Sequence, residues 1–301
     1  MWLCPTCAHP ADFLPANDPW PCGWACEACG TRPRRDSEIP YLAPELAEST
    51  ATFNPEMFDT LVRIEETSFW FVNRAALIVW LLKKHFPGAT NFLEIGCGTG
   101  SVLLALRRSD VQFRLFGSEL HSRGLEFARQ RLDRGITLMQ MDARKIPARG
   151  EFDIIGAFDV LEHIPEDDEV MREMHSALRT GGGVVIAVPQ HPWLWSPADE
   201  QAHHQRRYAR GELEAKLKRC GFAIERTTSF NSLLLPAMVA SRQLIKYRAR
   251  KQEAQEPLAE FETTKGVNGV LSEILRLEVA ATKAGFSWPV GGSRFVVARR
   301  Q

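Results

Sequence analysis

The sequence has no long apolar run and no excess of charge of either sign. Its longest apolar stretches, Leu77–Leu82 and Leu233–Ala240, are much shorter than the roughly 18 residues that span a bilayer. No basic segment followed by an apolar run stands at the start, so we expect no signal peptide and a cytoplasmic location. Lys plus Arg number 37 and Asp plus Glu number 37, and this zero net charge weighs against nucleic acid as the main partner.

Cysteine is scarce after residue 29, where only Cys97 and Cys220 occur. The pairs Cys4-x-x-Cys7 and Cys26-x-x-Cys29 lie within the first 29 residues, and 18 residues separate the two pairs. Each pair can present two thiolates from one turn, and two such turns complete a tetrahedral Zn²⁺ site. We predict a structural zinc ribbon with these four ligands. Redox-active pairs and a cluster that holds no metal remain alternatives, and Cys22 is a candidate to replace Cys26.

Strand-like and helix-like segments alternate through the middle of the 301-residue chain, whose length suggests about two domains. The expected strands are 91–95, 113–117, 136–140, 152–158 and 184–188, and the expected helices are 69–86, 101–108, 122–133 and 166–178. Residues 222–228 and 294–298 are the last two expected strands, while 31–60 is expected to be a linker with short turns. This alternation predicts an α/β doubly wound, mostly parallel sheet.

A glycine-rich turn, Gly96-Cys97-Gly98-Thr99-Gly100, joins the strand at 91–95 to the next helix. Glycines allow a tight turn and let a ligand approach the backbone at the carboxyl end of a strand. Glu119 follows Gly100 by 19 residues, at the end of the next strand, where a carboxylate can accept hydrogen bonds from ribose hydroxyls. Asp142-Ala143 ends the third strand. Together these residues predict a nucleoside-containing ligand.

These motifs, with Phe152-Asp153 and Asp159-Val160-Leu161-Glu162-His163-Ile164, resemble class I S-adenosylmethionine-dependent methyltransferases, especially the ubiquinone/menaquinone-biosynthesis group. The resemblance runs from about Glu65 to Thr228 and implies a Rossmann-like seven-stranded sheet with a C-terminal antiparallel strand. Residues 1–45 resemble the small zinc ribbons at the front of some bacterial methyltransferases. The implied organisation is a zinc ribbon at 1–45, a linker and N-terminal lid helices at 46–88, and a cofactor-binding domain at 89–301 with a helical insertion at 229–290.

The resemblance also implies which residues bind S-adenosylmethionine. Gly96, Gly98 and Gly100, with Cys97 between them, would pack on its methionyl part, and Glu94 would order water or the amino group. Further implied contacts are Glu119 with Leu120 at the ribose, Asp142 with Ala143 at the adenine, Phe158 with Asp159 at the methyl group, and Trp70 with Arg74 over the pocket. For Trp70 and Arg74, core packing and a surface charge are the alternative.

Methyl transfer needs alignment of the acceptor, and it needs a base only where the acceptor must lose a proton. The candidate catalytic residues are His163, His203, His204 and Tyr208, and His191 is a further histidine nearby in the sequence. A structural or lid role is the alternative for each of them.

The inserted residues 229–290 include a basic stretch, Ser241–Lys251, with Arg242, Lys246 and Arg250 spaced four apart. Residues 232–251 are therefore a candidate for peripheral contact with the inner membrane surface or for a lipid-like acceptor, and a packed lid helix is the alternative. Val267, Val270, Leu271 and Ile274 predict a second, core-facing helix. We expect a methyltransferase that acts on a small-molecule, lipid-linked or sugar-linked acceptor. An rRNA or tRNA base methyltransferase and a catalytically silent cofactor-binding scaffold are the alternatives.

Overall fold

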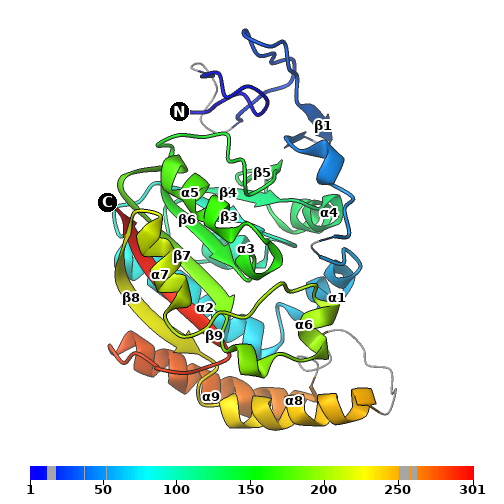
Figure 1. Ribbon diagram of the computed structural model, residues 1–301, viewed down its shortest axis with the longest axis vertical. Coiled ribbons are helices and arrows are strands. Elements are labelled where there is room, and N and C mark those ends of the chain that lie inside the picture. Colours follow the sequence, from blue (N-terminus) through cyan, green and yellow to red (C-terminus); the bar gives the residue numbers. More distant parts are fainter. Residues whose placement is uncertain (12–17, 37, 52, 251–257, 259–262) are drawn as a thin grey trace.

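A nine-stranded sheet forms the centre of the protein (Figure 1). The computed structural model describes residues 1–11, 18–36, 38–51, 53–250, 258 and 263–301, without the side chains of 245–250. Within them the strand order is β1-β2-β5-β4-β3-β6-β7-β9-β8, in which β1 and β9 run antiparallel to their neighbours. The strands are β1 Arg34–Asp36, β2 Ile39–Tyr41, β3 Asn91–Ile95, β4 Arg114–Glu119, β5 Thr137–Gln140, β6 Phe152–Phe158, β7 Leu178–Pro189, β8 Phe222–Phe230 and β9 Ser293–Arg300. The predicted seven-stranded sheet is confirmed as β5 to β8 of this order, and β1 and β2 extend it.

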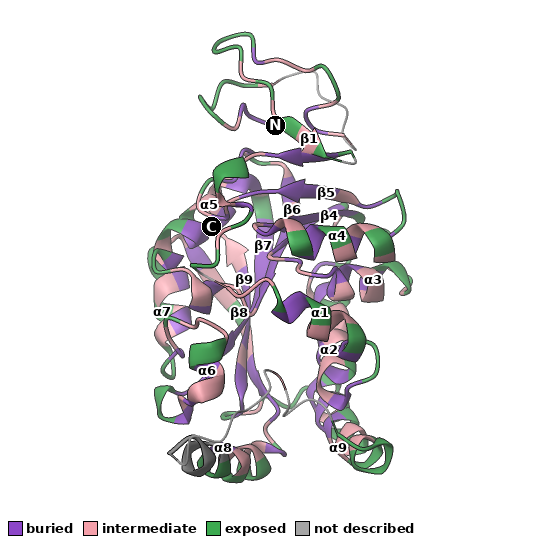
Figure 2. Cartoon of the chain, turned by 90° about the vertical axis from the view of Figure 1, so that its right-hand side faces the viewer, coloured by how far each residue is buried: buried purple, intermediate pink, exposed green. Residues whose placement is uncertain are grey.

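Two layers of helices cover the sheet because strand residues point alternately to opposite faces. In β3, Phe92 packs into the core of one face and Leu93 into the other. The first face holds α2 Phe69–His85, α3 Ser101–Arg107, α4 Ser122–Arg131 and α9 Lys265–Lys283. The second holds α5 Asp167–Ala177 and α7 Glu212–Arg219, and the buried strands lie between the two layers (Figure 2).

The N-terminal segment is part of this architecture. Residues 34–36 and 39–41, which we expected to be linker, form β1 and β2, and β2 pairs in parallel with β5 through Tyr41 and Gln140. No helix forms between β5 and β6, where every residue is described. The indole of Trp2 covers that part of the sheet, with ring centroids 5.8 Å from Phe116 and 5.5 Å from Phe152.

The C-terminal insertion lies at the opposite end of the molecule from the N-terminal segment and forms α8 Leu235–Arg250 and α9 (Figure 1). The expectation that Arg242 lies on an exposed basic face is wrong, because Arg242 is buried and pairs with Asp199 at 2.8 Å. The Lys246 and Arg250 side chains and residue 251 lie outside the described part. Val267 and Val270 are also not core residues, since 50% and 63% of their surfaces are exposed. Among the helices described, none has the length and apolar character needed to cross a bilayer.

Candidate active site

The carboxyl ends of β3, β4, β5 and β6 border a cavity of about 890 Å³. Parallel strands bring their carboxyl ends to the same edge of a sheet, so residues far apart in sequence meet there. The cavity is lined by twelve of the thirteen residues predicted to bind the cofactor: Trp70, Arg74, Glu94, Gly96, Cys97, Gly98, Glu119, Leu120, Asp142, Ala143, Phe158 and Asp159. Whether they bind it stays a prediction.

The thirteenth, Gly100, does not line the cavity. It is the N-cap of α3 at φ 80°, and a Cβ there would lie 2.7 Å from Leu132 Cδ1, so it shapes the helix start and packs away from the cavity. Gly96 has φ 65°, and a Cβ on it would lie only 2.5 Å from Val160 Cγ2. The left-handed backbone and the close approach together require glycine at position 96.

Glu119 fixes the glycine turn from the end of β4. Its carboxylate accepts hydrogen bonds from the backbone N–H groups of Gly98 at 2.9 Å, Leu120 at 2.8 Å and His121 at 3.1 Å. A carboxylate offers about four lone-pair sites, so three backbone donors leave acceptor capacity on the side that faces the cavity. The remaining acceptor site suits one further donor, such as a ribose hydroxyl.

Arg74 of α2 is buried beside the cavity, so the expected alternative of a surface charge is wrong for it. Its guanidinium donates to Asp159 at 2.5 Å and lies 4.9 Å from the Trp70 ring centroid. Asp159 follows β6 with φ 59°, a left-handed conformation that non-glycine residues rarely adopt. Such backbone strain is concentrated at functional sites. The Asp142 carboxylate also has a partner, since both its oxygens accept hydrogen bonds from the Arg144 guanidinium.

Two buried carboxyl groups face the same cavity. Burial raises the pKa of Glu94, with the charges of Glu65 and Glu119 adding to the shift and Arg74 opposing it. Burial also raises the pKa of Glu162, and the Asp159 carboxylate adds to the effect. Burial is likewise the main reason why the pKa of Cys97 is raised, and this agrees with a packing role for that thiol.

The structure separates the four candidate catalytic residues. His163 and His204 line the cavity, but His203 and Tyr208 do not. The prediction for Tyr208 is wrong because its buried hydroxyl donates to Asp167 at 2.7 Å, behind the cavity wall. His203, at φ 57°, is turned away from the lining by the same loop that places His204 in it.

Asp199 orients His204. The His204 Nδ1 lies 2.9 Å from Asp199 Oδ1, and Asp199 also pairs with Arg207 at 2.7 Å and Arg242 at 2.8 Å. Burial alone would raise the pKa of Asp199, but the hydrogen bond to His204 and the two guanidinium charges outweigh it and lower the pKa. Asp199 is therefore an acceptor, and the Nδ1 of His204 is the donor. This network could not be predicted from the sequence, because its members come from the short helix Pro197–Gln201, the loop that follows it, and α8.

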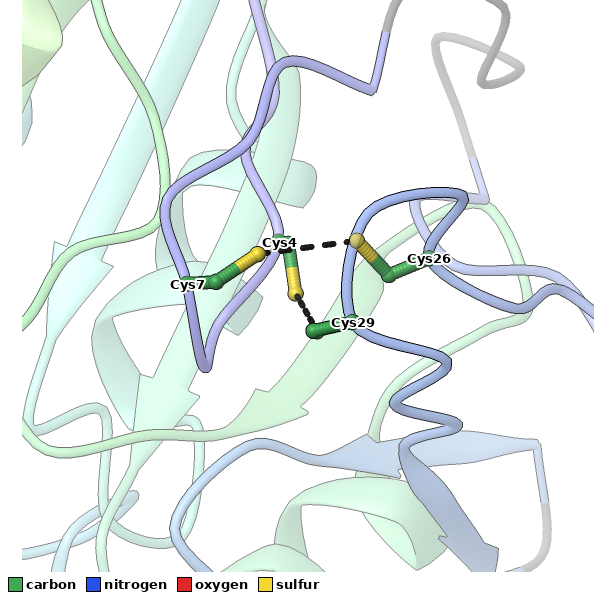
Figure 3. Close-up of side chains that lie close together, drawn as sticks. All are labelled: Cys4, Cys7, Cys26 and Cys29. Carbon is green, nitrogen blue, oxygen red and sulfur yellow. Dashed lines mark hydrogen bonds between the residues drawn. The ribbon is translucent and has the colours of Figure 1, made fainter.

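The four predicted zinc ligands lie together in the N-terminal segment (Figure 3). The Sγ atoms of Cys4 and Cys29 are 3.6 Å apart, as are those of Cys7 and Cys26. Disulfide sulfurs are about 2 Å apart, whereas four thiolates about 2.3 Å from a tetrahedral zinc lie about 3.8 Å from one another. The two turns match in their backbone bonds, since Ala8 N–H donates to Cys4 and Gly30 N–H donates to Cys26. Cys22 is exposed and outside the cluster.

Residues 92–182 match a protein family described as a methyltransferase domain. The chain contains an S-adenosylmethionine-dependent methyltransferase domain. A methyltransferase named GfsG from Streptomyces halstedii is 36% identical over 101 residues, which are 32% of this chain and 36% of that protein. A ubiquinone biosynthesis O-methyltransferase from Pseudomonas aeruginosa is 29% identical over 118 residues, 36% of this chain and 48% of the relative. The chain thus spans about half or less of the length of these relatives.

Solved structures share the fold of the methyltransferase domain at low identity. The [4+2]-cyclase SpnF has a TM-score of 0.53 at 18% identity, covering 85% of this chain and 98% of the cyclase. A chain in the complex between the Haloferax volcanii Trm112 methyltransferase activator and the putative methyltransferase has a TM-score of 0.52 at 16% identity, covering 80% of this chain and 96% of that one. These similarities support the α/β fold alone.

Proposed function

We propose that the protein transfers the methyl group of S-adenosylmethionine to a small-molecule, lipid-linked or sugar-linked acceptor by in-line attack. The position of the Glu119 carboxylate beside the glycine turn carries the proposal, because a carboxylate with remaining acceptor capacity at this edge of the sheet suits a ribose hydroxyl. The sulfonium is an activated donor, so the protein's main tasks are to align the acceptor and to exclude water.

The inserted helix α8 contributes the wall of the cavity that would contact the acceptor. Ala237 and Met238 of α8 and Leu234 just before it line the cavity, as do the aromatic side chains Phe58, Phe69 and Trp70. A cavity of about 890 Å³ lies within the usual range for small-molecule sites. A largely apolar wall of this size suits an acceptor with an aromatic, isoprenoid or acyl part.

The cofactor is tested by titration calorimetry with S-adenosylhomocysteine. Glu119→Gln keeps the size of the side chain but removes the charge that strengthens its hydrogen bonds, so we expect the Kd to rise roughly 10- to 100-fold. Glu126→Gln is the matched control, because Glu126 is an exposed acid on α4 that pairs with Arg123 and does not line the cavity. Absence of binding to the wild type, or equal Kd values for Glu119→Gln and the control, would refute the proposal.

The acceptor class is tested with S-adenosylmethionine that is labelled in its methyl group. Incubation with fractionated extract should move the label into organic-soluble or small-molecule fractions. Label in RNA would instead support a base methyltransferase. Cofactor binding without transfer into any fraction would support a silent scaffold.

We further propose that Cys4, Cys7, Cys26 and Cys29 hold a structural Zn²⁺. The support is the donor set and the sulfur separations of 3.6 Å. Metal analysis should show that Cys26→Ser loses one equivalent of zinc relative to the wild type, whereas Cys22→Ser loses none. Equal zinc contents in the wild type and Cys26→Ser would refute this site.

A further inference from the structure

Three further donor groups converge on the wall of the cavity, away from the cysteine cluster. Glu162 and His163 belong to the short helix Leu161–His163 that follows β6, and His204 follows the helix α6 at Pro197–Gln201. One ligand atom from each of the three lies within 4.8 Å of the others. The Gln205 N–H donates to the Glu162 carbonyl at 2.7 Å and so ties the two segments together.

Glu162 has no conventional partner in this arrangement. It is 0% exposed, and among the described residues neither carboxyl oxygen has a hydrogen-bond partner. A buried carboxyl group without a partner is costly, so such groups are normally hydrogen-bonded or bound to metals. Its Oε1 lies 4.0 Å from the Nε2 of His204, too far for a hydrogen bond.

His204 presents a lone pair toward this carboxyl group. Because Asp199 pairs with two arginines and stays ionised, it accepts a proton from Nδ1 and leaves Nε2 as the acceptor. A histidine that donates its other ring N–H to a carboxylate is the usual arrangement around a metal-binding imidazole. Two acceptors thus face each other across 4.0 Å, where an ion about 2.1 Å from each would fit between them.

We propose that Glu162, His163 and His204 form a binding site for a divalent first-row transition-metal ion, in the wall of the methyltransferase cavity. One carboxylate and two imidazoles are a donor set of catalytic zinc sites, and it leaves coordination positions open. These positions face the cavity that the predicted cofactor residues share.

The site has a consequence for the acceptor, and this consequence rests on the proposed function. A cation beside the methyl donor favours an acceptor that binds through a hydroxyl oxygen, since a bound cation lowers the pKa of that hydroxyl. The hydroxyl loses its proton to water, and its oxygen forms a bond to the methyl carbon as the sulfur–carbon bond breaks. The products are a methyl ether, S-adenosylhomocysteine and one proton.

Equilibrium dialysis against Mn²⁺ or Zn²⁺, followed by metal counting, tests the site. The wild type should hold one equivalent more of at least one ion than Glu162→Gln, whether or not the cysteine cluster is filled. His163→Ala should weaken this binding at least tenfold and provides a second variant if Glu162→Gln does not fold. His203→Asn is the matched control, because residue 203 lies outside the cavity and asparagine tolerates its positive φ.

Equal metal contents of the wild type and folded Glu162→Gln for both ions would overturn the site, as would loss of the extra ion in His203→Asn. S-adenosylhomocysteine titration of the same samples separates the two proposals. If the wild type binds the extra ion but no S-adenosylhomocysteine, the metal site stands and the proposed function fails. If it binds S-adenosylhomocysteine without the extra ion, the reverse holds.

Discussion

Replacement of Trp2 by alanine should release the N-terminal segment from the sheet. Trp2 is 95% buried, with 5% of its surface exposed, and its ring contacts Trp20, Phe116 and Phe152 at centroid distances of 5.1, 5.8 and 5.5 Å. Burial of about 200 Å² of indole surface contributes about 5 kcal/mol. Its Nε1 is buried without a hydrogen-bond partner in the described structure, a cost of about 1 kcal/mol. We therefore expect a loss of about 4 kcal/mol, within the range measured for aromatic-to-alanine changes in protein cores.

The loss can be measured by thermal unfolding. At about 2.1 cal/mol/K per residue, 301 residues give an unfolding entropy near 0.6 kcal/mol/K, so Tm should fall by about 6 °C. Trp2→Phe keeps most of the ring and removes the unpaired N–H, and we expect it to cost less than about 1.5 kcal/mol. Trp193→Ala is the control, since 58% of Trp193 is exposed. A Tm shift for Trp2→Ala no larger than that of Trp193→Ala would show that the segment does not stabilise the sheet.

Three further predictions concern the site and its surroundings. Gly96→Ala should weaken S-adenosylhomocysteine binding at least tenfold, because the added Cβ would lie 2.5 Å from Val160. Gly88→Ala is the control, since the space around residue 88 is open. Equal affinities of the two variants in calorimetry would contradict this prediction. Tyr208→Phe should lower the free energy of unfolding by about 1 kcal/mol and leave turnover unchanged, and a large loss of turnover at unchanged stability would restore a catalytic role for this hydroxyl. Asp167 is buried, which alone would raise its pKa, but hydrogen bonds from Lys216 and Tyr208 and the charge of Arg206 lower it. Because the folded-state pKa is depressed, the ionised group stabilises the fold above its unfolded pKa of about 3.9. Asp167→Asn should therefore cost roughly 3 kcal/mol from pH 5 to 8 in urea unfolding, and the difference from the wild type should shrink as the pH falls below about 4; a difference that grows there would refute the sign.

The sequence was sufficient to predict the central sheet because each strand has a continuous apolar pattern and a clear break. Residues 91–95 and 152–158 were expected as strands and form β3 and β6 with the same bounds. The cofactor edge was predictable for the same reason, since Gly96, Glu119 and Asp142 each lie at or just after the end of a strand of the parallel sheet. Gly100 was placed wrongly because the pattern of glycines cannot show which of them face a ligand and which pack against Leu132.

Loop residues were harder to predict, because their environment is made by distant segments. His203 and His204 are adjacent in sequence, and only the backbone turn at His203 decides which of them reaches the cavity. Arg242 was expected on a basic face because its four-residue spacing shows nothing of Asp199, which lies 43 residues earlier on another helix. The strand β2 was missed because three residues with a central proline give little strand signal, and its pairing with β5 supplies the order.

The pairing of β2 with β5 sets an order of events during synthesis. Tyr41 is synthesised about 100 residues before its partner Gln140, and about 150 residues separate Trp2 from its partner Phe152. Until then the strand β2 and the indole of Trp2 have no partners, and unpaired strand edges invite association with other chains. A segment that could fold around its own metal would remain compact during this interval. The two turns that carry the cysteines would then stabilise the nascent chain before they stabilise the folded protein.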